Sequence, residues 1–142
     1  MNETIRKFGY PETLLHEFEY WLVLVRPQQV TLGSLVLAAK SEATAFADLE
    51  AAAFSELGPV IAAIEGALSS QFGAEKMNYL MLMMADPHVH FHVIPRYSKT
   101  RELAGQSIDD AGWPGLPDLG SALAAGPALI SAIKDRLGGQ FE

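Results

Sequence analysis

The sequence predicts one α+β domain in which an antiparallel sheet packs against one principal helix. Three observations lead to this prediction: an early pair of strand-like runs, one long stretch with helical periodicity, and a second pair of strand-like runs. The chain has 142 residues, of which 49% are hydrophobic and 19% charged, so it can build one hydrophobic core and does not resemble a disordered chain. We expect about five strands, one principal helix and a C-terminal extension.

The early pair of strands is expected at residues 20–25 and 35–39. Residues 20–25 are aromatic and β-branched, and Gly33 follows a polar turn and opens the second apolar run. Two short strands joined by such a turn are expected to pair antiparallel. Residues 1–13 are polar and contain a glycine and a proline, which predicts a leading segment with little structure of its own.

Helical periodicity begins at Phe46. Apolar side chains then recur three or four residues apart, which is typical of one face of a helix. Proline removes a backbone hydrogen bond, so Gly58-Pro59 predicts either a kink or a short helix followed by a longer one that starts at Pro59. Gly73 is a typical C-terminal cap. The apolar positions are Phe46, Leu49, Phe54, Leu57, Ile61, Ile64, Leu68 and Phe72.

The second pair of strands is expected at residues 77–84 and 88–96. Only Ala85-Asp86-Pro87 separates them, and a turn this short predicts an antiparallel hairpin. Residues 98–142 are expected to form a Gly/Pro-rich loop and a short terminal helix packed on the same domain.

Composition excludes several functions. Ten Lys and Arg against seventeen Asp and Glu give a net charge of −7, and such a surface repels nucleic-acid backbones. The chain has no cysteine, which removes disulfides, thiolate metal sites and cysteine nucleophiles. No signal segment is visible at the start, and the most apolar runs fall short of the roughly 20 residues that span a bilayer. We therefore expect a cytoplasmic protein with neither nucleic-acid nor membrane partners.

Three of the four histidines occur in five residues, at His88, His90 and His92. Side chains alternate along a strand, so the three imidazoles are expected to share one face while Val89 and Phe91 point to the core. Three adjacent titratable rings do not serve packing, and clustered groups of this kind mark functional sites. The trio is the main candidate site in the chain.

A metal site is one interpretation of this trio, because imidazole is a common ligand of zinc, nickel and iron. In a strand, however, His88 and His92 would lie about 13 Å apart at the backbone. With metal–nitrogen bonds of about 2.1 Å, all three rings cannot meet on one ion. A metal-binding protein that uses part of the His88/His90/His92 strand is therefore an alternative that needs a further ligand from elsewhere.

The other interpretation is acid–base and nucleophilic chemistry on phosphorus, and here the sequence resembles a known family. Residues 88–94, His-Val-His-Phe-His-Val-Ile, resemble the signature of the histidine triad (HIT) nucleotide hydrolases and transferases. The resemblance extends from about residue 14 to residue 97, so residues 1–97 are expected to form a HIT-like catalytic domain. It implies chemistry without a metal or other cofactor, a nucleotide as small-molecule substrate, and a homodimer.

The resemblance also implies roles for the three histidines. His90 would be the nucleophile that forms a nucleotidyl-histidine intermediate at the α-phosphate, and His92 would bond the phosphate or leaving group through its outer nitrogen. His88 would fix the tautomer of His90 through its backbone carbonyl. Phosphoramidates, dinucleoside polyphosphates and aminoacyl nucleotides are the expected substrates. A nucleotide-binding module with no catalytic turnover is the alternative.

Several positions depart from the family pattern. The phosphate-binding loop that usually precedes the triad is missing, so we expect Gln106 and Ser107 either to fold back and replace its donors or to lie in a solvated loop. Arg26 stands where many members have an acidic or amide residue on the ribose, which predicts either binding to an anionic group of the substrate or an exposed arginine. Ser34 replaces a histidine, and Trp113 resembles an aromatic element near the site in some relatives.

Overall fold

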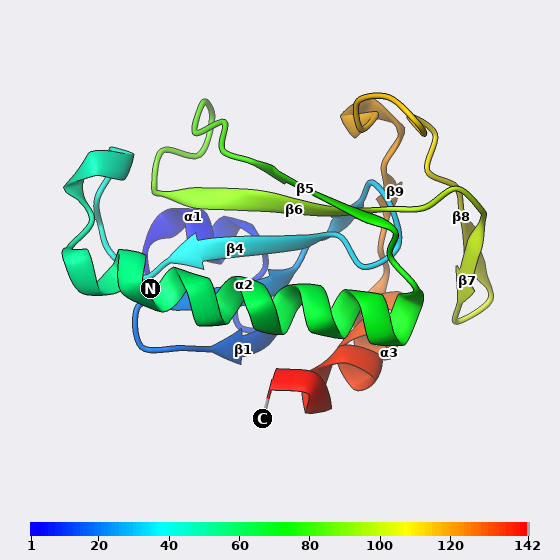
Figure 1. Ribbon diagram of the computed structural model, residues 1–142, viewed down its shortest axis with the longest axis horizontal. Helices are drawn as coiled ribbons and strands as arrows, with labels where there is room; N and C mark the ends of the chain where they lie inside the picture. Colours follow the sequence, from blue (N-terminus) through cyan, green and yellow to red (C-terminus); the bar gives the residue numbers. More distant parts are fainter. Residues whose placement is uncertain (142) are drawn as a thin grey trace.

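A five-stranded antiparallel sheet forms the centre of the protein in the computed structural model, which describes residues 1–141 (Figure 1). The strand order is β1-β2-β4-β6-β5. Helix α2 crosses the front of this sheet in Figure 1, so the predicted α+β architecture with one principal helix is confirmed. The strands are β1 (Leu14–Glu17), β2 (Trp21–Val25), β4 (Leu35–Ala39), β5 (Lys76–Leu80) and β6 (His90–Arg96).

Two small sheets flank the central one. Strand β3 (Gln28–Gln29) pairs with β9 (Leu123–Ala124), and β7 (Arg101–Leu103) pairs with β8 (Gln106–Ile108). The β7–β8 hairpin follows the end of β6 and lies at the right edge of Figure 1.

Helix α2 (Ala51–Phe72) is continuous and contains Pro59. The predicted second helix starting at Pro59 is therefore wrong, because the helix passes through this position without ending. Pro59 lies on the exposed side of α2, where water can satisfy the carbonyl group that loses its partner. The predicted helical start at Phe46 belongs instead to a separate 3-10 turn, η1 (Phe46–Asp48). Gly73 caps the helix with φ +69° as expected.

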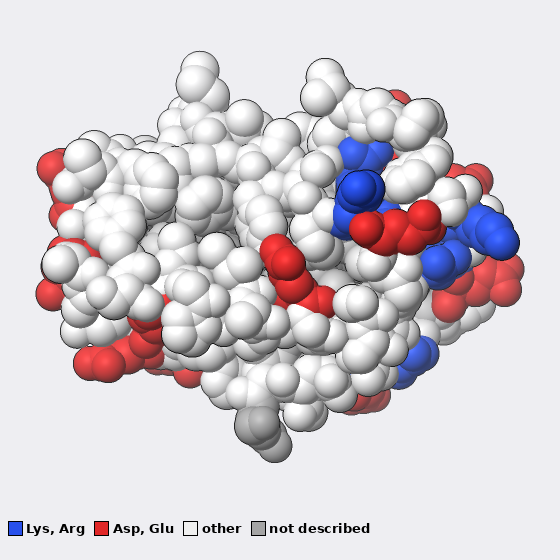
Figure 2. All heavy atoms as spheres, viewed as in Figure 1, with Lys and Arg blue, Asp and Glu red and all other residues white. Residues whose placement is uncertain are grey.

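The buried side of α2 forms the main core with the sheet. Val60, Ile64 and Leu68 are fully buried and belong to one cluster with the inward residues of the strands. Within residues 1–141, α2 is the one helix that is long and apolar enough to cross a membrane. Core helices of soluble proteins often have the same length and composition. Figure 2 shows this side of the molecule, where charged side chains gather mainly toward the two ends and few lie over the middle.

A short helix at the start of the chain covers part of the opposite face of the sheet. The expectation of little structure in residues 1–13 is wrong, since α1 (Glu3–Lys7) forms there. Asn2 Oδ1 accepts a hydrogen bond from Ile5 N at 3.0 Å, and Asn2 Nδ2 donates to the carbonyl oxygens of Ala39 and Ser41 at 3.1 and 2.9 Å. Ile5 is fully buried in a second core cluster. These tertiary bonds hold a helix that five residues alone could not sustain.

The connection between β5 and β6 is longer than expected. Strand β5 ends at Leu80 and β6 begins at His90, so the predicted three-residue turn is wrong and residues 81–89 form a loop. The antiparallel pairing itself is present, with Lys76 opposite Arg96. Within the loop, Met83 has φ +50° and the side chain of Met84 is 89% exposed. Met81, Met83 and Met84 therefore belong to this loop rather than to a strand.

The C-terminal part packs on the same sheet. Helix α3 (Pro127–Leu137) buries three apolar side chains in the main core: Leu129, Ile133 and Leu137. The segment between β6 and α3 is held by a buried ion pair, in which Arg96 Nε and Nη2 donate to Asp110 Oδ2 and Oδ1 at 2.7 and 3.0 Å. The remaining short turns are η2 (Leu119–Ser121) and η3 (Gly138–Phe141).

Candidate active site

His90 and His92 lie together at the start of β6, on the face of the sheet opposite α2. Their neighbours Val89 and Val93 belong to the core cluster beneath α2, so alternation along the chain turns both imidazoles to the α1 side. The two rings are 5.0 Å apart between centroids and nearly perpendicular, and the two residues are 1% and 7% exposed. The sequence prediction that these two rings share one face agrees with this placement.

The ring of His90 is oriented by backbone. Its Nδ1 lies 2.7 Å from the carbonyl oxygen of His88. A carbonyl oxygen can only accept a hydrogen bond, so in the neutral ring the proton lies on Nδ1 and Nε2 has the lone pair. This is the tautomer that a nucleophilic imidazole requires.

The ring of His92 has an arginine as its neighbour. Arg26 Nε lies 3.2 Å from His92 Nδ1, and Arg26 Nη1 donates to the carbonyl oxygen of Gln28 at 2.6 Å. Burial lowers the pKa of His92 to about 4, and the positive charge of Arg26 and the proximity of His90 act in the same direction, while Asp86 opposes them. Burial also lowers the pKa of the Arg26 guanidinium. Arg26 is therefore neither a solvated strand-end residue nor distant from the triad.

His88 faces elsewhere. It lies two residues before the start of β6. Its Nδ1 is 2.8 Å from Thr4 Oγ1, and its Nε2 is 3.3 Å from Glu42 Oε2. The prediction that all three imidazoles share one face is thus wrong for His88, because the strand alternation starts only at His90. Its backbone carbonyl contacts His90, whereas its side chain ties α1 to the segment that follows β4.

A cavity of about 300 Å³ opens beside the two buried histidines. The ring centroid of Phe8 is 5.5 Å from that of His90 and 5.7 Å from that of His92, so the residue after α1 forms one wall. The opposite wall is the loop between β5 and β6. The lining residues are Phe8, Arg26, Leu82, Met83, Met84, Ala85, Asp86, His90 and His92.

A second cavity of about 520 Å³ adjoins the first and shares Ala85 and Asp86 with it. Asp86 Oδ1 forms a salt bridge with Lys7 Nζ at 2.7 Å, and this contact joins α1 to the loop. Sequence reasoning missed the whole contribution of α1, whose asparagine cap at Asn2 was the available signal.

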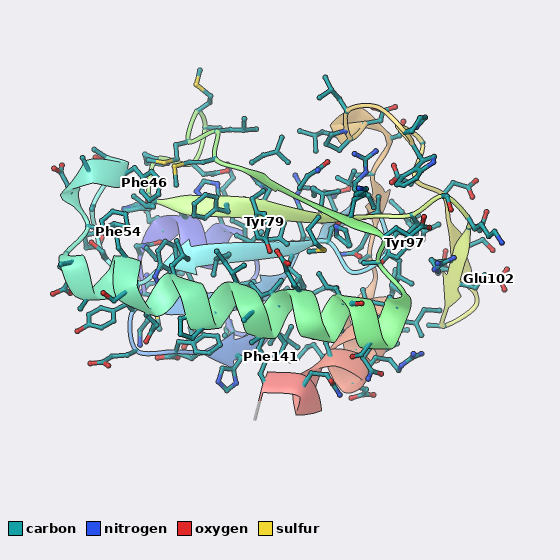
Figure 3. All side chains as sticks on the ribbon, in the orientation of Figure 1. Phe46, Phe54, Tyr79, Tyr97, Glu102 and Phe141 are labelled. Atoms are coloured by element: carbon teal, nitrogen blue, oxygen red, sulfur yellow. The ribbon has the colours of Figure 1, made fainter. Side chains whose placement is uncertain are left out.

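Gln106 and Ser107 do not reach the histidines. Both belong to β8, beyond the far end of β6, and a seven-residue strand spans roughly 20 Å. Ser107 Oγ donates to Glu102 Oε1 at 2.8 Å, and Figure 3 shows Glu102 at the right edge of the molecule. Of the two alternatives for this segment, the one in which it folds back and replaces the missing phosphate loop is wrong, because the segment closes on itself as a hairpin.

Two other positions also lie outside the cavity. Ser34 is fully buried and donates to the carbonyl oxygen of Thr31, so it serves the turn before β4. Trp113 lines a separate cavity with Lys76, Asn78 and Arg96. Within residues 1–141, no three His, Asp or Glu side chains come close enough together to hold a metal ion.

Comparison with known proteins identifies the family. The model of the HIT domain matches residues 8–99. The chain belongs to the HIT family. The predicted resemblance is therefore confirmed, and membership places this HIT protein in a superfamily of nucleotide-binding proteins and hydrolases.

Solved structures show the same fold. A histidine triad protein from Sinorhizobium meliloti 1021 has a TM-score of 0.76 and 18% identity, and covers 99% of this chain and 95% of its own. One from Marinobacter aquaeolei VT8 has a TM-score of 0.75 and 19% identity, with 99% and 94% coverage. Plasmodium falciparum diadenosine triphosphate hydrolase has a TM-score of 0.58 and 15% identity, with 63% and 64% coverage. A comparison with curated proteins finds no significant match.

Proposed function

We propose that this HIT protein hydrolyses or transfers nucleotidyl groups at the α-phosphate through a covalent intermediate on His90. The observation that carries this proposal is the 2.7 Å contact between His90 Nδ1 and the His88 carbonyl, which leaves the Nε2 lone pair free for attack. Family membership supports the nucleotide substrate. The name of the Plasmodium relative, a diadenosine triphosphate hydrolase, supports the reaction class.

The proposed reaction has two steps. His90 Nε2 attacks the α-phosphorus, a phosphorus–nitrogen bond forms, and the bond to the leaving group breaks with its electrons on the leaving atom, which takes a proton from solvent. Water then attacks the phosphorus and releases a proton, and the electrons of the phosphorus–nitrogen bond return to His90. His92 donates a hydrogen bond to the phosphate or leaving atom, and Arg26 supplies positive charge to the phosphate.

The chemistry of this site fits nucleoside phosphoramidates, dinucleoside polyphosphates and aminoacyl nucleotides, since each joins a leaving group to an α-phosphate. A cavity of about 300 Å³ suits a small molecule. No residue in the proposed steps requires a metal or other cofactor. A homodimeric state and a cytoplasmic location remain predictions that accompany this proposal.

The decisive experiment measures release of AMP from adenosine 5′-phosphoramidate in excess EDTA. Wild type is expected to turn over, and His90→Asn is expected to lose about a thousandfold or more of kcat, because the amide of asparagine has no nitrogen lone pair that can attack phosphorus. The matched control is His16→Asn, which removes an imidazole that stacks on Phe141 away from the cavity. Equal rates in wild type and His90→Asn would overturn the proposal.

The intermediate offers a second test. After an alkaline quench, mass spectrometry of wild type reacting with substrate should find one added AMP group on the peptide that contains residues 88–96. His90→Asn should carry none. An AMP group on another peptide would assign the nucleophile elsewhere.

A nucleotide-binding protein without catalytic turnover is the second candidate. It is favoured by one observation, namely that Gln106 and Ser107 lie outside the cavity and do not supply phosphate donors there. Under this alternative, calorimetry detects AMP binding to wild type while EDTA-treated wild type releases no AMP from the phosphoramidate.

A further inference from the structure

We infer that Arg26 is a positioning residue that holds the proton of His92 on Nε2, so that the two active-site histidines are fixed in opposite tautomers. The inference deepens the proposed function and rests on it for the use made of this proton. The location of the proton follows from the contacts alone.

The polarity of its partner determines which nitrogen of His92 carries the proton. Arg26 Nε is 3.2 Å from His92 Nδ1, and a guanidinium group has five N–H donors and no acceptor. A protonated Nδ1 would place two hydrogens against each other, so Nδ1 must accept and the single proton of the neutral ring must sit on Nε2. The outer nitrogen of His92 is then a hydrogen-bond donor.

The arginine is held in place from both sides. Its Nη1 donates to the Gln28 carbonyl oxygen in β3 at 2.6 Å, while Gln29 Nε2 donates to the Arg26 carbonyl oxygen at 2.7 Å. Arg26 also follows β2 directly, and its backbone N–H donates to the Ser34 carbonyl oxygen at 2.9 Å. The backbone and guanidinium contacts together fix the orientation of Nε toward His92.

The surroundings of His92 favour the neutral form of its ring, to which this tautomer belongs. The charged or titratable groups that face it are Arg26 after β2, His90 on β6 and Asp86 in the loop, and Asp86 is engaged by Lys7 of α1. The uncharged ring of Phe8 covers the remaining side. Burial and Arg26 together lower the pKa of His92 to about 4, so the ring remains neutral at physiological pH.

The two histidine side chains therefore have different hydrogen-bonding roles in the site. In the neutral rings, the acceptor-only carbonyl of His88 leaves His90 Nε2 without a proton, and the donor-only guanidinium of Arg26 leaves His92 Nε2 with one. One ring can attack phosphorus and the other can donate to the oxygen or leaving atom beside it. The role of His92 requires no change of protonation before substrate binds, because its ring is neutral.

The test is nitrogen NMR of the imidazole rings in uniformly ¹⁵N-labelled protein, with His92 assigned by comparison with His92→Asn. In wild type we expect a protonated Nε2 and an unprotonated Nδ1, with titration only near pH 4. In Arg26→Met we expect the pKa of His92 to rise by about one unit and the Nδ1-protonated tautomer to appear. Arg26→Lys keeps a cationic donor and is expected to restore the wild-type tautomer.

Arg6→Met is the matched control, because it removes the same charge from α1 without removing a bond to His92. It should leave the tautomer unchanged, and backbone amide spectra of all variants report whether each one folds. A wild-type His92 protonated on Nδ1, or an Arg26→Met spectrum identical to wild type, would overturn the inference. The measurement uses no substrate, so failure to release AMP would reject the proposed function and leave the tautomer result intact.

Discussion

His90 and His92 present their Nδ1 atoms to partners of opposite polarity, a backbone carbonyl at 2.7 Å and a guanidinium Nε at 3.2 Å. The rings stand 5.0 Å apart between centroids. Two histidines of the same strand thus differ in which ring nitrogen carries the proton in the neutral form, although both line the same cavity.

The first prediction concerns acid stability. The folded-state pKa of His92, about 4, lies below its ordinary value of about 6.5, so the unfolded chain binds a proton that the folded chain does not. The free energy of unfolding should therefore fall as the pH drops from about 6.5 to 4, and His92 should account for about 2 kcal/mol of that fall.

Urea unfolding at pH 7 and at pH 4.5 measures this contribution. His92→Asn should show a smaller loss between the two pH values than wild type, because it lacks the imidazole whose folded-state pKa is lowered. Equal losses in wild type and His92→Asn would show that His92 titrates alike in the folded and unfolded chains.

The second prediction concerns Asn2. Its side chain caps α1 and also bonds the carbonyl oxygens of Ala39 and Ser41, so Asn2→Ala removes three hydrogen bonds from a residue that is 3% exposed. We expect a loss of about 1–3 kcal/mol, together with faster hydrogen exchange in residues 3–8.

Phe8 should lose its fixed position in this variant, so AMP release should decline as well. Glu3→Ala is the control, because Glu3 lies exposed in the same helix and its side chain does not cap it. Unchanged hydrogen exchange in residues 3–8 of Asn2→Ala would show that α1 does not depend on its cap.

The third prediction concerns the buried ion pair of Arg96 and Asp110, whose side chains are 4% and 1% exposed. Asp110→Ala leaves the Arg96 charge buried and also removes the acceptor of Tyr97 N. We expect a loss of about 3–5 kcal/mol in urea unfolding. Asp109→Ala, at the exposed neighbouring position, should cost much less, and a similar cost for both variants would contradict the assignment.

The fourth prediction contrasts two glycines. Gly66 lies on the exposed side of α2, and an added Cβ there meets nothing within 4 Å, so Gly66→Ala should stabilise the protein by about 0.5–1 kcal/mol. Gly33 has φ +86°, and a Cβ there would come within 2.8 Å of Leu68 Cδ2, so Gly33→Ala should destabilise. Thermal unfolding of both variants checks the opposite signs.

The sequence predicted the layered fold because its strongest signals are local periodicities. The apolar spacing of α2 and the alternation through β6 both reflect which side of each element faces the core. The helix, the strands and the shared face of His90 and His92 could therefore be predicted from the sequence. Pro59 was misleading, since proline interrupts a helix in general but is tolerated where the lost hydrogen bond faces solvent.

The parts that could not be predicted depend on contacts between distant residues. The loop 81–89 contains the run of apolar residues that is typical of a strand. In the structure, however, Met84 is 89% exposed, and Met83 and Met84 line the cavity beside the histidines. Arg26 and His92 are 66 residues apart, and Thr4 and His88 are 84 residues apart. No local pattern encodes such pairs, so the roles of α1 and Arg26 emerged only from the folded chain.

The hydrogen-bond partners of His90 and His92 differ in how readily a mutation can remove them. The acceptor for His90 is a main-chain oxygen of residue 88, which every amino acid possesses, so no single substitution deletes it. The donor for His92 is a side chain, and one codon change removes it. Variation in the chemistry of this site is therefore expected to enter through Arg26 and His92, while the orientation of His90 persists for as long as the strand itself folds.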